Sequence, residues 1–305
     1  MRVALNHTTT YRYDRPVILS PQIIRLRPAP HCRTPISSYM LTLRPSYHFL
    51  TWQQDMQHND LARVVFPERT RELQVSVDLI ADMTGLHSFD VCLETAAERY
   101  PFAYEPWLAQ ELAPCLATEV AGPRLQDWLD DVHRQARRTV DFLIQLNHRL
   151  QRDIAYAVRL EPGIQSCEET LVQGQGSCRD SAWLLIQILR HLGLAARFVS
   201  GYLIQLATDA TVLSGSSGPI GDTLDLHAWV EVYLPGAGWV GLDPTSGLLT
   251  GEGHIPLVCA PDAASAAPIT GTVEPCAATF DVAMSVTRLH EEAGRSVSAS
   301  KLTTM

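Results

Sequence analysis

Residues 174–193, GQGSCRDSAWLLIQILRHLG, contain the pattern that decides the fold of the second half of the chain. Two glycines and a serine form a turn, and Cys178 then opens an apolar run at helical spacing. Ser177 and Asp180 have the spacing of a helix capping box, and Gly193 stands where a helix commonly ends. The pattern therefore predicts a buried helix whose first residue is Cys178.

The predicted position of Cys178 has chemical consequences. Unpaired N–H groups and the helix dipole favour a thiolate over a thiol at a helix N-terminus. The same N–H groups can donate to an oxyanion that forms beside the sulfur. A cysteine at this position is also common as a small buried residue, so the position alone leaves both interpretations open.

Two later segments carry side chains that would complete a nucleophilic site. Residues 227–234, HAWVEVYL, alternate like a half-buried strand that opens on His227, and Asp243 ends the next predicted strand. A histidine base activates a thiol, and a carboxylate fixes the histidine tautomer and stabilises imidazolium. Asp222 and Asp225 are alternatives for this carboxylate, but they lie in or beside a Ser/Gly-rich loop, whereas a strand end is a rigid support.

The N-terminal part of the chain has the pattern of a β-domain. Residues 73–80 and 39–44 alternate apolar and polar side chains, and shorter apolar runs are separated by Pro, Asn, Asp and Gly. We therefore predict a small antiparallel β-sandwich over residues 1–98. Its histidines are interpreted as surface or packing residues rather than ligands: His7, His31, His48 and His58.

The remaining boundaries follow from composition and helical spacing. Residues 99–138 are predicted to be a linker with a connecting helix, and Thr139 is predicted to cap the helix that opens a catalytic core over residues 139–258. Residues 259–305 are predicted to be a C-terminal extension whose last part is poorly structured. The Ser/Gly-rich loop 214–221 is either a solvated insertion or a lid.

Composition and charge exclude several classes of protein. The 305 residues, 46% hydrophobic and 19% charged, fit a folded protein of about two domains. The net charge of −9 supplies no basic field, so we expect neither nucleic acid nor a membrane as a partner. No apolar run matches a membrane helix or a secretory signal, which predicts a cytoplasmic protein. The seven scattered cysteines lack a C-x-x-C pair, which argues against a disulfide framework and a structural zinc site.

Three segments resemble the motifs of the bacterial transglutaminase-like superfamily: GSCRDSA at 176–182, HAWVEVYLP at 227–235 and GWVGLDPT at 238–245. Position by position, the resemblance implies that Cys178 is the nucleophile, His227 the base and Asp243 the orienting carboxylate. The N-terminal part, with HTTTYRY at its start, is similar to the β-domain that often precedes this core in bacteria.

The resemblance implies an α+β fold with a papain-like core, in which the cysteine helix packs on an antiparallel sheet. It also implies cysteine-dependent acyl transfer through a thioester, and we expect a cysteine peptidase or amidase that acts on a peptide or protein substrate without a metal or organic cofactor. A protein-glutamine transglutaminase is the first alternative, because the superfamily includes both kinds of enzyme. A non-catalytic binding or scaffold protein is the second alternative, although retention of Cys178 argues against it.

The chain departs from the family pattern at two places, which leaves the shape of the substrate cleft open. Ser181 and Trp183 stand where many relatives have an aromatic residue and a histidine, and residues 259–262 replace a Gly-Arg-Asp-Tyr-like segment.

A few further residues have two interpretations. Trp229 either lines the cleft, as one wall of an amine-acceptor tunnel, or simply packs. Tyr202 and Gln175 are candidates to assist the oxyanion, and Asp180 is interpreted as a cap rather than a catalytic group. Three cysteines are interpreted as bystanders: Cys167, Cys259 and Cys276.

Overall fold

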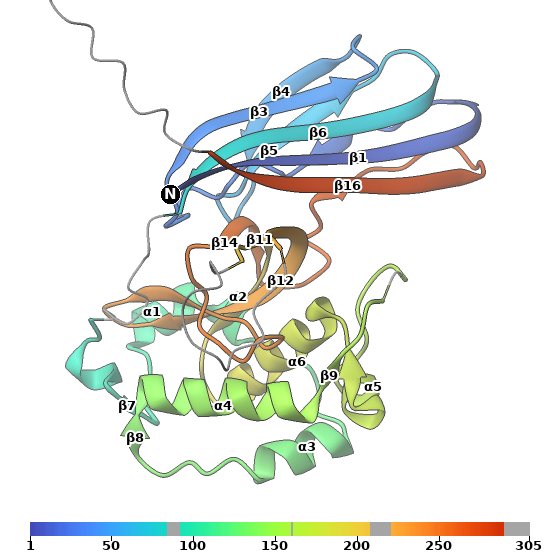
Figure 1. Ribbon diagram of the computed structural model, residues 1–305. Helices are drawn as coiled ribbons and strands as arrows, with labels where there is room; N and C mark the ends of the chain where they lie inside the picture. Colours follow the sequence, from blue (N-terminus) through green and yellow to red (C-terminus); the bar gives the residue numbers. More distant parts are fainter. Residues whose placement is uncertain (84–91, 160, 208–220, 290–305) are drawn as a thin grey trace, which may run out of the picture.

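The computed structural model describes residues 1–83, 92–159, 161–207 and 221–289. Three layers follow one another in Figure 1: an N-terminal β-domain, a central antiparallel sheet, and a group of helices on the far side of that sheet. Because most strand pairs are antiparallel and the helices are segregated, the architecture is of the predicted α+β class. Within the described residues no helix is long and apolar enough to span a bilayer.

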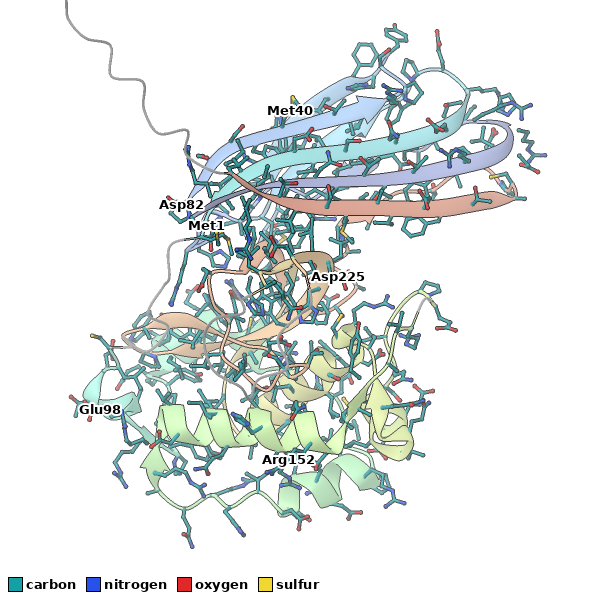
Figure 2. The ribbon with its side chains drawn as sticks, in the orientation of Figure 1. Met1, Met40, Asp82, Glu98, Arg152 and Asp225 are labelled. Carbon is teal, nitrogen blue, oxygen red and sulfur yellow. The ribbon has the colours of Figure 1, made fainter. Side chains whose placement is uncertain are left out.

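The N-terminal domain contains two four-stranded sheets with the orders β16-β1-β6-β3 and β15-β2-β5-β4. Alternate side chains of β6 enter the core, which is the period-two burial that the sequence predicted for residues 73–80. The α-amino group of Met1 lies 3.8 Å from Oδ1 of Asp82 at one end of the first sheet (Figure 2). The strands that precede the core are β1 (Arg2–Val17), β2 (Gln22–Ile24), β3 (Ile36–Arg44), β4 (Phe49–Gln54), β5 (Asp60–Val65) and β6 (Thr70–Asp82).

The C-terminal part of the chain, predicted as an extension over residues 259–305, returns to this domain and adds a strand to each of its sheets. Strand β16 (Ala278–Leu289) pairs antiparallel with β1 from Tyr13↔Ala278 to Arg2↔Leu289, and β15 (Ile269–Thr270) pairs with β2. The physical reason is that β1 has an open edge whose backbone groups need partners. Residues 290–305, which include most of the segment predicted to be poorly structured, lie outside the described residues.

The central sheet has the order β13-β12-β11-β14 and is antiparallel throughout. Helix α6 (Cys178–His191) packs on β12 and β11. The helix begins at Cys178, as predicted, and Gly193 follows its last turn in a left-handed conformation. The Gly193 N–H donates to Arg190 O, and the Leu194 N–H donates to Leu189 O. The strands are β11 (Ala196–Gln205), β12 (Thr223–Leu234), β13 (Gly238–Leu242) and β14 (His254–Ala260).

Short elements surround the core helices. The segment predicted to be a linker contains several of them, and Thr139 is the first residue of α4 rather than its cap, because its hydroxyl donates to the carbonyl of Ala97. The helices are η1 (Thr95–Ala97), α1 (Pro106–Glu111), α2 (Ala113–Leu116), α3 (Pro123–Asp130), α4 (Thr139–Asp153) and α5 (Cys167–Gln173). Two-residue strands are β7 (Arg99–Tyr100), β8 (Arg137–Arg138), β9 (Ala155–Tyr156) and β10 (Gln175–Gly176).

The β-domain and the central sheet are joined by buried polar contacts. The Asn59 side chain donates through Nδ2 to Cys259 O at 2.9 Å and accepts from Cys259 N–H at 2.8 Å, as a strand neighbour would. Nδ1 of His7 lies 2.8 Å from the hydroxyl of Tyr202, and burial lowers the pKa of His7 to about 4, so this histidine is neutral near pH 7. The catalytic-core candidate is therefore packed against the β-domain rather than tethered to it.

Candidate active site

Cys178 is partly exposed at the first position of α6. The turn before it is held by Asp180, whose Oδ2 accepts from the Ser177 N–H at 2.8 Å and from the Ser177 hydroxyl at 2.7 Å. The capping interaction that the sequence predicted for these two residues is present. It fixes the backbone immediately before the thiol and leaves the thiol at the positive end of the helix.

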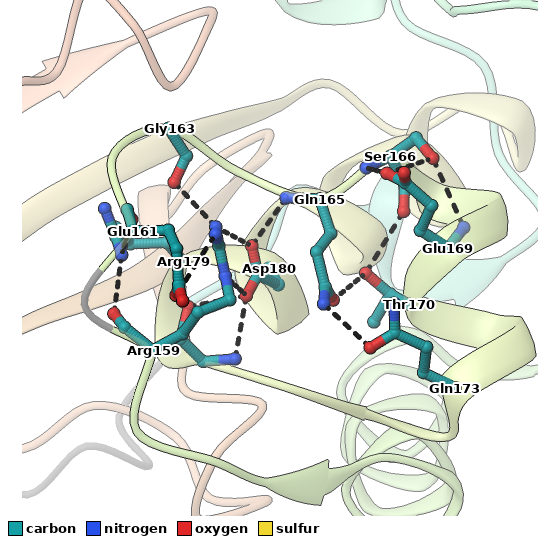
Figure 3. A network of polar contacts seen from close by, with 11 residues as sticks. Arg159, Glu161, Gly163, Gln165, Ser166, Glu169, Thr170, Gln173, Arg179 and Asp180 are labelled. Carbon is teal, nitrogen blue, oxygen red and sulfur yellow. Dashed lines mark hydrogen bonds and ion pairs between the residues drawn. The ribbon is translucent and has the colours of Figure 1, made fainter.

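Asp180 is also the centre of a wider polar network (Figure 3). Its carboxylate accepts from Arg159 Nε at 3.0 Å and Nη2 at 3.1 Å, and from the Gln165 N–H at 2.7 Å. Burial raises the pKa of Asp180, but these donors outweigh burial and hold the pKa below its ordinary value. The carboxylate thus stays ionised and ties the segment around Arg159 to the start of α6, which agrees with a structural role.

His227 lies on β12 with its ring between Cys178 and Asp243. Its Nε2 is 3.2 Å from Oδ1 of Asp243, and both side chains are almost fully buried. Burial by itself lowers the pKa of His227, but contacts with the Asp243 carboxylate and with the Cys178 thiol outweigh it and raise the pKa to about 10. The structure therefore brings the three predicted site residues together around the His227 ring.

Asp243 follows β13 directly and is fixed by the turn after the strand. Oδ1 accepts from the Thr245 N–H at 2.9 Å, and Oδ2 accepts from the Ser246 hydroxyl at 3.0 Å. The side-chain amide of Asn147, on α4, donates to the Asp243 carbonyl at 3.1 Å. Burial raises the pKa of Asp243, but its bonds to His227 and to a second histidine lower it far below its ordinary value.

That second histidine is His254, at the start of β14, which the sequence did not identify as a site residue. Its Nε2 lies 3.5 Å from Oδ2 of Asp243, on the other oxygen from the one that faces His227. The contact forms because the chain folds back after β13, and a single histidine at a strand start has no motif or spacing that predicts it. The carboxylate is thus shared by two histidines.

Trp229 packs against both histidines, whose own ring centroids are 6.2 Å apart. Its ring lies nearly parallel to that of His227, with centroids 6.4 Å apart, and edge-to-face against His254 at 5.2 Å. The residue is only 1% exposed, so of the two interpretations the packing role is the one that the structure supports. A cavity of about 50 Å³ behind it is lined partly by Trp229, Glu231, Trp239 and His254, and Cys178 is not among its described lining residues.

The alternative site residues lie elsewhere. Asp222 pairs with Arg288 at 2.7 Å, and Asp225, labelled in Figure 2, is exposed on β12. The hydroxyl of Tyr202 is bound by His7 in the β-domain, while Gln175 is exposed on β10. The loop 214–221 falls almost entirely outside the described residues, so its interpretation as a lid stays a prediction.

Two groups of side chains bring metal-type donor atoms within 4.8 Å of one another: His227, Asp243 and His254, and His31, Glu231 and Cys259. The first is the site just described. In the second, Nη2 of Arg197 lies 2.6 Å from Glu231. Burial raises the pKa of Glu231, but Arg197 and His31 outweigh it and lower the pKa to about 2. A guanidinium therefore already compensates this carboxylate, and we interpret the second group as a buried ion-pair network.

Both parts of the chain match known protein families. Residues 3–82 match the bacterial transglutaminase-like N-terminal region, and residues 126–244 match the transglutaminase-like superfamily. An uncharacterized protein of Mycobacterium tuberculosis is 28% identical over 280 residues, which cover 89% of this chain and 87% of that protein. A protein-glutamine gamma-glutamyltransferase of Pseudomonas aeruginosa is 32% identical over 131 residues, which cover 40% of this chain and 17% of that protein.

A solved structure extends the likeness to the whole fold. The crystal structure of a candidate cysteine protease from Cytophaga hutchinsonii matches with a TM-score of 0.65 at 17% identity, covering 96% of this chain and 92% of that chain. At this identity the match supports the fold, in which a β-domain precedes a cysteine-helix core, and leaves the reaction to be argued from the site. On the two family matches, residues 126–244 belong to the transglutaminase-like superfamily and residues 3–82 to the bacterial transglutaminase-like N-terminal region.

Proposed function

We propose that the protein is a cysteine-dependent acyl-transfer enzyme that forms a thioester on Cys178 and releases it mainly by hydrolysis, as a peptidase or amidase. The observation that carries the proposal is the position of His227, which has the Cys178 thiol on one side and a buried carboxylate 3.2 Å away on the other. Such an arrangement supplies a nucleophile, a proton donor and an orienting group without further chemistry from outside the chain.

In the first half-reaction the Cys178 thiolate attacks the carbonyl carbon of an amide, and a C–S bond forms. Backbone N–H groups at the start of α6 stabilise the oxyanion. As the tetrahedral intermediate collapses, the C–N bond breaks and His227 gives its Nδ1 proton to the leaving amine. The neutral imidazole that remains is held by Asp243, which accepts from Nε2 and keeps the proton-free Nδ1 toward the sulfur.

In the second half-reaction water attacks the thioester, and Nδ1 of His227 accepts the proton that water loses. The C–S bond breaks, a carboxylic acid leaves, and the thiolate–imidazolium pair is restored. Attack by a primary amine in place of water would give a new amide, which is the transglutaminase reaction.

Water is the preferred acceptor because an amine acceptor must be neutral. Free lysine has a pKa near 10.4, so an enzyme that uses it at neutral pH needs a site that removes solvent and proton from the ammonium. Trp229 was the one side chain that the sequence offered as a wall of such a site, and it is buried against His227 and His254. The alternative, protein-glutamine transglutaminase, is supported by the similarity to the protein-glutamine gamma-glutamyltransferase of Pseudomonas aeruginosa.

A competition experiment tests the proposal. The protein is incubated with a peptide library that contains glutamine and with millimolar labelled primary amine, and mass spectrometry quantifies acid products, amine adducts and acyl groups on Cys178. We expect an acyl adduct of Cys178 and an excess of acid over amine adduct. The matched control is Cys92→Ala, which removes an exposed thiol on another segment and should leave both products unchanged.

Each other outcome has a definite meaning. A dominant amine adduct identifies a transglutaminase and contradicts hydrolysis. Turnover by Cys178→Ala equal to that of the wild type contradicts the thioester mechanism itself.

A further inference from the structure

We propose that His254 is a positioning residue, which holds the Asp243 carboxylate in the orientation that His227 requires by donating a hydrogen bond from Nε2 to Oδ2. The proposal deepens the acyl-transfer function and rests on it, because it concerns the same site. His254 acts on the reaction through its contact with Asp243 and not through the Cys178 sulfur.

The tautomer of His254 follows from its second contact. The Gly251 N–H lies 3.2 Å from Nδ1 of His254, and a backbone N–H can only donate, so Nδ1 must accept. In a neutral imidazole the proton is then on Nε2, which faces Oδ2 of Asp243 at 3.5 Å. An imidazolium would place two N–H donors against each other at Gly251, so this contact favours the neutral ring.

The surrounding groups leave His254 little freedom. Its ring is packed edge-to-face on Trp229, and the start of β14 is held by pairing with Leu203 on β11. The titratable and charged groups around the site are Cys178 from α6, His227 from β12, Asp243 after β13, and, across the cavity, His31, Arg33 and Glu231. Among these, Asp243 is the group within bonding distance of the His254 ring.

The two oxygens of the Asp243 carboxylate face two different histidine rings, and this fixes the orientation of the carboxylate. Oδ1 of Asp243 faces His227 at 3.2 Å, and Oδ2 is occupied by His254 and the Ser246 hydroxyl. With Oδ2 held from two sides the carboxylate cannot rotate to exchange its oxygens without losing bonds in a buried site. His227 therefore meets an acceptor of fixed direction in each turnover.

Nuclear magnetic resonance of the full chain with 15N-labelled histidine tests the proposal without any substrate. In the wild type at pH 7 we expect His254 as the Nε2–H tautomer. In His254→Phe, which keeps a flat ring but removes the donor, the titration midpoint of His227 should fall by about one pH unit. A carboxylate that is held less firmly stabilises the imidazolium less, so the lowering of the His227 pKa by burial has more effect. His254→Gln, whose amide can donate to the same oxygen, should keep the midpoint close to that of the wild type.

The result that overturns the proposal is either an Nδ1–H tautomer or imidazolium for His254 at pH 7, or an unchanged His227 midpoint in His254→Phe. Because the wild-type tautomer is read without substitution, a variant that fails to fold does not block the test. Once a substrate is known, His254→Phe should lower kcat about tenfold with KM little changed. If the histidine spectra are as expected but no thioester forms on Cys178, the proposed function is contradicted and the positioning role of His254 is not.

Discussion

Nε2 of His227 and Oδ1 of Asp243 lie 3.2 Å apart, and their side chains are only 6% and 2% exposed. A charged pair so far from water is held by its own attraction and by the donors around the carboxylate, because solvent contributes little. The pair is therefore both a catalytic candidate and a pH-dependent element of the fold.

The stability of the protein should depend on pH through this pair. The pKa of His227 rises from 6.5 to about 10 in the folded state, so its contribution is complete below pH 6.5 and is lost as pH rises to about 10. The pKa of Asp243 is lowered from 3.8, so its contribution is present above that pH and is lost as pH falls below it. Urea unfolding should show that Asp243→Asn costs about 3 kcal/mol near pH 5.5 and much less at pH 10.

Asp225→Asn is the matched control, because this carboxylate is exposed on β12, the strand that carries His227, and should give a small effect that does not vary over the same range. A cost of Asp243→Asn that increased from pH 6.5 to pH 10 would reverse the expected sign.

Substitution of the site residues should give non-additive losses of activity. Cys178→Ala and His227→Ala should each lower kcat at least about a thousandfold, and the double variant should be no worse than either single one, because the two residues act as a unit. Asp243→Asn should lose less than either. Circular dichroism and unfolding curves check that each variant is folded, and an additive double variant would show that the two residues act independently.

Alkylation of the seven free thiols should be fastest at Cys178. Its sulfur is partly exposed at a helix start beside an imidazolium, whereas Cys115, Cys167 and Cys259 are buried. Burial raises the pKa of Cys32 to about 11 and that of Cys167 to about 12, which leaves little thiolate at pH 7. Peptide mapping after brief treatment with iodoacetamide measures the order, with the exposed Cys92 as the internal comparison, and faster labelling of Cys92 would refute the prediction.

Removal of the charge of Asp180 should disturb both the fold and the thiol. Asp180→Asn weakens the pairing with Arg159 in a buried site and should cost about 3 kcal/mol in the free energy of unfolding. The rate of Cys178 alkylation should change as well, because the turn before the helix is released. Glu169, an exposed first-turn acid that caps α5 in the same way, is the control, and Glu169→Gln should leave the Cys178 rate unchanged.

The junction between the β-domain and the core should depend on Asn59. Asn59→Ala leaves the buried N–H and carbonyl of Cys259 without partners and should cost about 3 kcal/mol. Asn6→Ala removes an exposed amide that donates to Asp78 at 2.7 Å and should change stability by less than about 0.5 kcal/mol. Equal costs for the two substitutions, measured by urea unfolding, would show that the Asn59 contact does not hold the junction.

The local parts of the fold could be predicted from the sequence. The start of α6 at Cys178 follows from a turn, a cap and an apolar period that are all contained in residues 174–193. Strand β13 (Gly238–Leu242) is the strand that was predicted to end at Asp243. The family motifs then indicated which helix and strands carry the candidate site, and the structure brings those three residues together.

The contacts that could not be predicted join segments far apart in the chain. Strand β16 alternates apolar and polar residues around Val282, Met284 and Val286, but that pattern does not reveal that its partner is β1. His254 reaches Asp243 because of the turn between them, and Asn59 reaches Cys259 because two domains dock. Each of these contacts depends on tertiary structure, which the local periodicity of the sequence does not predict.

The pairing of β16 with β1 also bears on the order of events during translation. Strand β1 precedes the core in the chain, and β16 is the last of the described strands to be made. Until β16 is made, β1 pairs with β6 on one side and has an unpaired edge on the other. The core, which lies between β1 and β16 in the sequence, has all its own strands by that time. A nascent chain that stalls after the core therefore carries the candidate cysteine site beside an incomplete sheet, and the synthesis of β16 is what closes that sheet.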